Sequence, residues 1–273
     1  MKRTTSQFIE ILATIKTEFE RCITKKTFNG KKYKNGNEAK NAYIRSQRLI
    51  CLVHEFIKQQ LIDLSIDPKK IFPPIGANKP EINIEGLLKK KNQDICILPR
   101  ALTDEKVQLK DEPFIDSGIV INIRSQLSSL NKNFDTLYER TFAEPLNLHL
   151  KFPKLCMGEV YLIPTHEYND KAMFKNRIDF KSVSKLGKYI QAFQAVNNRG
   201  NSGKDPYRYE RVCLAIVDFR QSPPKLYSNN EALVEDGLIS RELSANMEKL
   251  GIDDFVKDLL DIYGERFNLN LLR

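Results

Sequence analysis

The stretch that decides the fold class is residues 118–124, which read Gly-Ile-Val-Ile-Asn-Ile-Arg. Isoleucine stands at every second position, and the positions between hold valine, Asn122 and Arg124. Successive side chains of a strand point to opposite faces of a sheet. The stretch therefore predicts a buried strand that presents Asn122 and Arg124 on one shared face.

Other apolar runs of strand length lie on both sides of this stretch, at residues 93–99, 157–164 and 212–219. Helical spacing of apolar residues occupies 5–24, and a long helix is expected from about Glu38 to Leu64, with Asn37 as its N-cap. A further helical stripe, residues 134–142, should end near Pro145. Strands mixed with helices in this order predict an α/β fold with a mixed central sheet flanked by helices.

The domain organisation expected from this pattern is one domain that spans residues 1–273. It would have a helical N-terminal part at 1–74, an α/β core at 75–220 and a helical C-terminal part at 221–273. No repeat, low-complexity tract or linker interrupts it.

The composition excludes several classes of protein. The chain has 273 residues, of which 41% are hydrophobic and 29% charged, and no apolar run approaches the length of a membrane span. The N-terminus lacks the apolar core of a signal peptide. An odd number of widely spaced cysteines predicts neither a disulfide framework nor a zinc site. We therefore expect a soluble, cytoplasmic protein without a membrane partner; the cysteines are Cys22, Cys51, Cys96, Cys156 and Cys213.

The charge is positive and unevenly distributed. The chain carries a net charge of +9, although residues 229–273 hold ten acidic and only five basic side chains. A basic body favours a polyanionic partner such as DNA. The basic loop 25–36 and the Gly-rich loop 197–208 are candidate DNA contacts, and a solvated turn is the alternative for each. The candidate side chains are Lys31, Lys32, Lys34, Arg199 and Lys204.

Several kinds of catalytic site are excluded by their motifs. The loop 199–205 has glycines too closely spaced for a phosphate-binding loop, and no dinucleotide-binding fingerprint follows any expected strand. His54, His149 and His166 lie in different elements without a partner motif, and a structural role is expected for each. Metal-dependent phosphodiester hydrolysis, in contrast, needs carboxylates and a nearby cation. Asp94, Asn122 and Arg124 suit that chemistry, although Asp94 could instead cap a turn.

Three segments together resemble the PD-(D/E)xK nuclease core: residues 93–95, 120–126 and 133–140. They are similar to type II restriction endonucleases whose second strand reads E-x-K-S-Q before a helix that begins N-F. Residues 152–164 and 209–213 look like the strands that follow that helix. The resemblance covers roughly residues 75–220 and implies a restriction-endonuclease-like core that cuts double-stranded DNA with Mg²⁺ and leaves 5′-phosphate ends.

The resemblance also implies roles for individual residues. Asn122 stands where the family has its acid and Arg124 where it has its lysine. In some restriction enzymes the acid lies on the next helix instead, and Glu139, fifteen positions after Arg124, is close to that arrangement. Asp94 and Glu139 are then expected to hold Mg²⁺, with Asn122 completing the metal shell and Arg124 acting on the phosphate.

Other residues enter this interpretation as alternatives or as neighbours. Asp135 and Glu144 are the alternatives to Glu139 on the same helix. Ser125 and Gln126 are expected to contact the DNA backbone, or to form structural hydrogen bonds instead. Glu55 is an outlying candidate for metal binding.

The function expected from these residues is that of a type II site-specific deoxyribonuclease, acting as a homodimer on a palindromic site. Two alternatives stay open. One is a catalytically inactive DNA-binding module of the same fold, and the other is a structure-specific DNA repair nuclease.

Overall fold

The computed structural model describes residues 3–100, 108–183, 185–201, 203–243 and 245–273. Its centre is a six-stranded sheet with the strand order β13-β12-β9-β8-β6-β3. The neighbours β8, β9 and β12 are parallel, whereas β3, β6 and β13 each join the sheet through antiparallel pairing. The expected α/β class with a mixed sheet flanked by helices is confirmed. The six strands are β3 (Ile71–Phe72), β6 (Ile95–Ile97), β8 (Ile119–Ser125), β9 (Cys156–Pro164), β12 (Arg211–Asp218) and β13 (Lys225–Tyr227).

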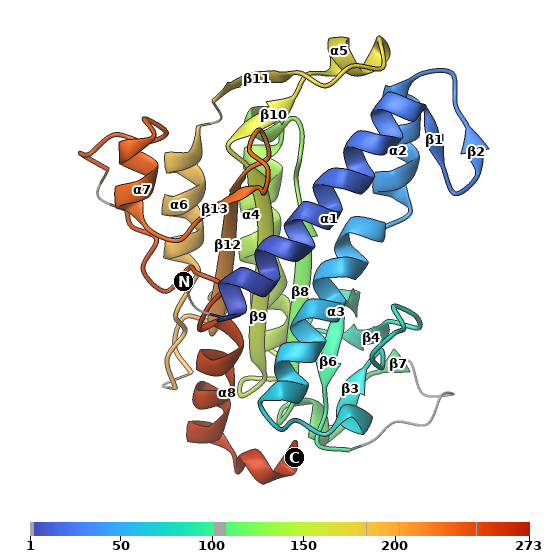
Figure 1. The fold of residues 1–273 in the computed structure, drawn as a ribbon. Helices are drawn as coiled ribbons and strands as arrows, with labels where there is room; N and C mark the ends of the chain where they lie inside the picture. The colour runs from blue at the N-terminus through green and yellow to red at the C-terminus, as the bar shows by residue number, and fades with distance from the viewer. Residues whose placement is uncertain (1–2, 101–107, 184, 202, 244) are drawn as a thin grey trace.

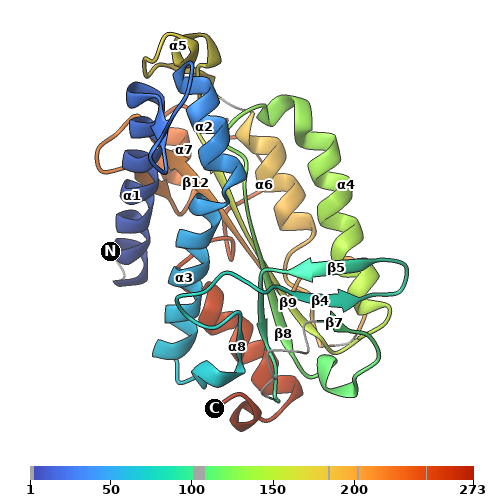
Figure 2. The same cartoon turned by 90° about the vertical axis from the view of Figure 1, so that its right-hand side faces the viewer.

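Helices cover both faces of this sheet, and each face has its own apolar core (Figures 1 and 2). On one face lie α1 (Arg3–Lys25), α3 (Arg48–Asp63) and α8 (Phe255–Arg266). On the other lie α4 (Leu130–His149) and α6 (Leu186–Ala195). The isoleucines at 119, 121 and 123 belong to the first core, so Asn122 and Arg124 face the side of α4 and α6.

Smaller elements surround the central sheet. A second sheet pairs β4 (Ile82–Glu85) with β5 (Lys90–Gln93) and β7 (Gln108–Leu109). Two hairpins stand at one end of the molecule (Figure 1), β1 with β2 and β10 with β11. The remaining elements are β1 (Thr27–Phe28), β2 (Lys31–Lys32), α2 (Gly36–Arg45), η1 (Pro68–Lys70), η2 (Pro113–Ile115), β10 (His166–Tyr168), α5 (Asp170–Phe174), β11 (Phe180–Val183), α7 (Asn230–Glu235) and η3 (Leu269–Leu271).

The long helix expected from Glu38 to Leu64 is in fact two helices, so that prediction is wrong in its extent. α2 ends at Arg45 and α3 begins at Arg48, with Gln47 between them at a φ of 60°. A left-handed residue cannot continue a right-handed helix. The N-cap is also Asn35 rather than Asn37, because the Asn35 side chain accepts a hydrogen bond from the Glu38 amide.

The helix expected to end near Pro145 continues through this proline to His149. Proline removes one helical hydrogen bond, which usually ends or kinks a helix. Here the residues on one face of α4, at spacings of three and four, are all buried against the sheet, and this packing outweighs the lost bond. They are Leu137, Thr141, Glu144 and Leu148.

Across the part of the chain that the structure describes, no helix combines the length and apolar character needed to cross a membrane. All five cysteines are free, and four of them are buried.

Candidate active site

A row of polar side chains crosses three neighbouring strands of the central sheet. Asn122 on β8 pairs in register with Glu159 on β9. Asp94 comes directly before Ile95, which pairs with Ile121, so Asp94 lies on the other side of Asn122. Neighbouring strands are about 4.8 Å apart. The row therefore places one carboxylate on each side of the Asn122 amide.

Asp94 is fixed by hydrogen bonds at both its main chain and its side chain. Its amide donates to Oδ1 of Asn122 over 3.2 Å, and its Oδ2 accepts from the amide of Ile123 over 2.7 Å. The Asp94 carboxylate thus continues the β6–β8 ladder where β6 stops. On the opposite face of the sheet, Nε2 of the buried His54 lies 3.8 Å from Asp94 Oδ2.

The Asn122 side chain is buried and oriented by its neighbours. Its Nδ2 donates to Oε1 of Gln93 over 3.0 Å and approaches Oε1 of Glu144 at 3.4 Å. With Nδ2 bonded on one side, Oδ1 points to the Asp94 amide. The amide is therefore held with its oxygen toward Asp94.

Two cations converge on one carboxylate of α4. Nη2 of Arg124 forms a short ion pair with Oε2 of Glu144, and Nζ of Lys91 lies 2.5 Å from Oε1 of the same residue. Burial opposes the ionisation of Glu144, but the attraction of Arg124 and Lys91 outweighs it and lowers its pKa. Burial also lowers the pKa of Lys91. Glu144 is thus an ionised partner of both cations.

Glu159 has a very different environment. Its side chain is wholly buried, and its Oε1 lies 3.1 Å from Nη1 of Arg124, yet neither carboxylate oxygen has a hydrogen-bond partner among the described residues. Burial raises the pKa of Glu159 to about 8, and the nearby charges of Glu144 and Asp94 add to this rise against the attraction of Arg124. This carboxyl is poised to gain or lose a proton near neutral pH.

The helix acid that reaches the site is Glu144 and not Glu139. Glu139 is exposed on α4, and no hydrogen bond or ion pair within the described part of the chain joins it to Asp94, Asn122 or Arg124. Asp135 is exposed as well. Glu144 lies about 1.4 turns further along the helix, on the buried face, which explains why spacing along the sequence alone selected Glu139.

Glu159 and Lys91 were missed in the sequence, although Glu159 carried a signal. It is the only charged residue in the apolar run 157–164, and acidic side chains are rarely buried without a partner. A lone acid in a buried strand therefore indicates a functional site. Lys91 had no comparable signal, because it belongs to a run of three lysines.

The residues expected to contact DNA have different environments. Lys31, Lys32, Lys34 and Lys204 are exposed. The prediction for Arg199 is wrong, since this side chain is buried and donates to Oε1 of Glu210 over 2.9 Å.

Ser125 ends β8, Gln126 follows it, and both are half-buried. Nε2 of Gln126 donates to the carbonyl of Ser129 over 3.1 Å, and its Oε1 accepts from the hydroxyl of Tyr161 over 3.0 Å. These bonds give Gln126 the structural role that was the alternative to a DNA contact.

Comparisons with models of protein families, with curated proteins and with solved structures found no match to this chain.

Glu159 and Asp94 are the two residues of the row that offer oxygen donors to a hard divalent cation. Within the described residues, no three or more His, Cys, Asp or Glu side chains are grouped to hold a metal ion. Mg²⁺, however, is commonly held by one or two carboxylates together with water and substrate phosphates. Glu159 offers two buried oxygens without a hydrogen bond, and Asp94 offers a second, partly exposed carboxylate. These two residues would hold the ion, with Glu144 committed to Arg124 and Lys91.

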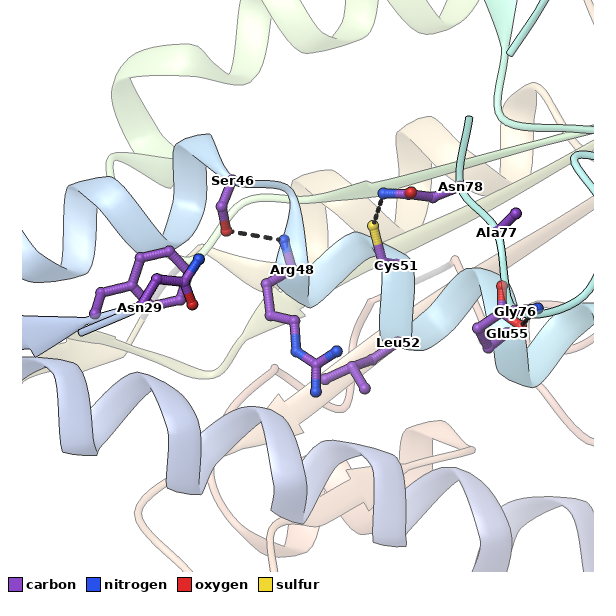
Figure 3. Close-up of a pocket in the computed structure, with 10 residues that line it drawn as sticks. Asn29, Ser46, Arg48, Cys51, Leu52, Glu55, Gly76, Ala77 and Asn78 are labelled. Atoms are coloured by element: carbon purple, nitrogen blue, oxygen red, sulfur yellow. Dashed lines mark hydrogen bonds between the residues drawn. The ribbon is translucent and has the colours of Figure 1, made fainter. Parts of the chain in front are cut away.

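Glu55, the outlying candidate for metal binding, has a structural role instead. Its Oε1 accepts from Lys58 over 2.7 Å and its Oε2 from the amide of Gly76 over 2.6 Å. Figure 3 shows it beside a cavity of about 300 Å³ between α3 and residues 76–78. Asn78 and Cys51 also line this cavity, and Nδ2 of Asn78 donates a hydrogen bond to the Cys51 sulfur over 2.8 Å. Glu55 thus fixes a loop.

Proposed function

We propose that this protein is a Mg²⁺-dependent endonuclease that cuts double-stranded DNA in the manner of a type II restriction enzyme. The observation that carries the proposal is the row of Asp94, Asn122 and Glu159 across β6, β8 and β9, with Arg124 two residues beyond Asn122 on the same face. The strand arrangement supports it: an antiparallel β3–β6–β8 meander is followed by the crossover helix α4 and by β9, parallel to β8. The resemblance to a PD-(D/E)xK core places its second strand before a helix and another strand after that helix, and β8, α4 and β9 follow that order.

In this proposal Glu159 on β9 replaces the acid that the family has at the position of Asn122 on β8. Asn122 carries no charge, but its register partner Glu159 places a carboxylate beside it. Asp94 and Glu159 would hold the cation, and Glu159 would have to be ionised to do so. Bound Mg²⁺ would supply a Lewis acid for the scissile phosphate and a water of lowered pKa.

Arg124 and Lys91 supply the positive charge that a phosphodiester needs. Both converge on Glu144, where their nitrogens bind carboxylate oxygens in the way they would bind phosphate oxygens. Arg124 is always protonated, so it stabilises charge and orients the phosphate without accepting a proton. A homodimer would present two such sites to a palindromic target.

The test is cleavage of supercoiled plasmid and phage DNA in Mg²⁺, with the ends of the products mapped by sequencing. We expect discrete fragments from the wild-type protein and a loss of at least about 100-fold in Asp94→Asn and in Glu159→Gln. Glu139→Gln is the matched control and should cut normally, since that acid is exposed. Unchanged cutting by Asp94→Asn would reject the site.

One observation favours a second function, a DNA-binding module that does not cut. The cations of the site are already paired with Glu144, and an arginine replaces the family's lysine. Tight, salt-sensitive binding of DNA without product in Mg²⁺ or Mn²⁺ would select this alternative.

A further inference from the structure

An arm built from β10, α5 and β11 (residues 166–183) extends from the end of the sheet that the parallel strands point to. β9 ends at Pro164 and β10 begins at His166, so the arm follows directly from the carboxyl end of β9 (Figure 1). Arg124 is the last residue but one of the parallel neighbour β8. In open α/β sheets, ligands bind beyond the carboxyl ends of the strands.

The arm is held rigidly at both its base and its tip. At the base, the Glu167 carboxylate accepts hydrogen bonds from the amides of Ser129 and Leu130, over 2.8 and 2.9 Å, at the start of α4. Near the tip, Oδ1 of Asn176 accepts from the amide of Gly36 over 2.8 Å. A Cβ at Gly36 would lie 2.3 Å from the Ile23 carbonyl oxygen, so glycine permits α2 to begin this close to the end of α1.

The tip of the arm presents cations to solvent. Lys171, Lys175 and Arg177 are exposed. The arm's acids are engaged within it, because Asp170 pairs with Lys181 at 2.9 Å and Asp179 accepts from Asn169 Nδ2 over 3.1 Å. The three exposed cations outnumber Asp179, the exposed acid without an ion pair in the described structure, so the tip carries a net positive charge.

An aromatic side chain stands among these cations. Phe174, the last residue of α5, is 56% exposed, whereas Ala172 and Met173 before it are buried. A membrane-binding helix needs a broad apolar face, and α5 offers a single ring. A lone aromatic ring surrounded by cations suits duplex DNA, where such rings insert between base pairs while Lys and Arg bind the phosphates.

We propose that the tip of the arm contacts duplex DNA, with Lys171, Lys175 and Arg177 on phosphates and Phe174 inserted between two base pairs as a wedge. Lys31 and Lys32 of the basic hairpin β1–β2 are exposed as well. Gly36, which follows this hairpin in the sequence, contacts Asn176 of the arm, so the hairpin extends the positive surface of the tip. This inference rests on the proposed function for its choice of DNA as partner, but it concerns binding and not cleavage.

The test measures binding separately from cutting. The Asp94→Asn protein is titrated in EDTA onto a fluorescein-labelled 30-bp duplex, and anisotropy gives Kd over a range of salt concentrations. We expect the triple variant Lys171→Ala, Lys175→Ala, Arg177→Ala to bind at least about tenfold more weakly and to lower the slope of log Kd against log salt by about 2 to 3. Lys69→Ala, Arg241→Ala, Lys257→Ala removes the same charge elsewhere and should keep the slope.

The wedge is tested by Phe174→Ala in the same background. We expect at least about fivefold weaker binding with an unchanged salt slope, together with loss of the fluorescence rise of a 2-aminopurine probe in the duplex. Leu271→Ala, which removes another exposed apolar side chain, is the control and should bind normally. Thermal melting checks that each variant is folded.

Three outcomes overturn the inference. Equal weakening by both triple variants would mean that only net charge matters. Unchanged DNA binding by Phe174→Ala would reject the wedge, and loss of binding to phosphatidylserine vesicles in that same variant would assign the tip to a membrane. If the arm variants behave as expected but wild-type protein cuts no DNA, the proposed nuclease function fails and the DNA-binding surface stands.

Discussion

Two wholly buried glutamates, Glu159 and Glu210, show how differently this fold treats the same side chain. Glu210, at the entrance of β12, has ample partners. Its Oε2 accepts from the Met157 amide over 2.6 Å, and its Oε1 lies 2.9 Å from Arg199 and 2.7 Å from Arg266. Glu159, on the adjacent strand β9, has one ion-pair contact and no hydrogen bond within the described structure.

The pKa values of the two carboxyls diverge accordingly. Burial raises both, but His149, Arg266 and the Met157 amide lower the pKa of Glu210 to about 2. Glu159 is left with a pKa of about 8. Buried polar groups are usually satisfied, and those that are not concentrate at functional sites. Glu210 thus has a structural role, whereas the unsatisfied carboxyl of Glu159 is the one that the proposed metal binding would use.

The largest effect that follows from this contrast is on stability. Glu210→Gln removes the charge that compensates two buried guanidinium groups, and we expect it to lower the free energy of unfolding by about 3–5 kcal/mol. Glu159→Gln at pH 7 removes a carboxyl that is protonated in the folded protein but ionised in the unfolded chain, so it should leave the free energy of unfolding unchanged or raise it. Urea unfolding followed by circular dichroism measures both. Equal losses would show that the two acids have the same role.

The pH dependence of stability sharpens the comparison. Between pH 4.5 and about 8, Glu159 is protonated in the folded protein and ionised in the unfolded chain. The folded state then holds the extra proton, so this group makes stability fall as the pH rises. Glu159→Gln lacks the effect, and its free energy of unfolding minus that of the wild-type protein should rise by up to about 1.4 kcal/mol per pH unit.

The rise in this difference should level off above pH 8, and urea titrations from pH 5 to 9 measure it. Lys257→Ala, which alters an exposed residue of α8, is the control and should give a flat difference. A flat difference for Glu159→Gln as well would show that Glu159 is ionised throughout this range.

The smallest effect is expected for an exposed acid. Glu139→Gln should change the free energy of unfolding by no more than about 0.5 kcal/mol, because Glu139 is exposed on α4. Thermal melting of the variant beside Glu210→Gln tests this. A loss comparable to that of Glu210→Gln would place Glu139 in a network that the structure does not contain.

The strands of the parallel core could be predicted from the sequence because most of their side chains are apolar, with Glu159 as the charged exception inside β9; every residue of β9 and β12 is buried. The break at Gln47 could not, since a glutamine at positive φ carries no turn signal. The passage of α4 through Pro145 depends on packing against the sheet, which is not written in the helix itself.

The site shows the same division. Alternation within residues 118–124 was enough to place Asn122 and Arg124 on one face. The residues that complete the cluster depend on strand register and helix rotation: Glu159 enters through pairing with Asn122, and Glu144 through its place on the buried face of α4. Neither relation follows from spacing along the chain.

The Glu210 cluster has a consequence for the kinetics of folding. It joins segments far apart in the sequence, from His149 at the end of α4 to Arg266 at the end of α8. Contacts between such distant segments carry a large loop-closure cost, so they form late on the folding pathway. Interactions made after the transition state slow unfolding more than they speed folding. We therefore expect the cluster to slow unfolding and so to prolong the lifetime of the native state.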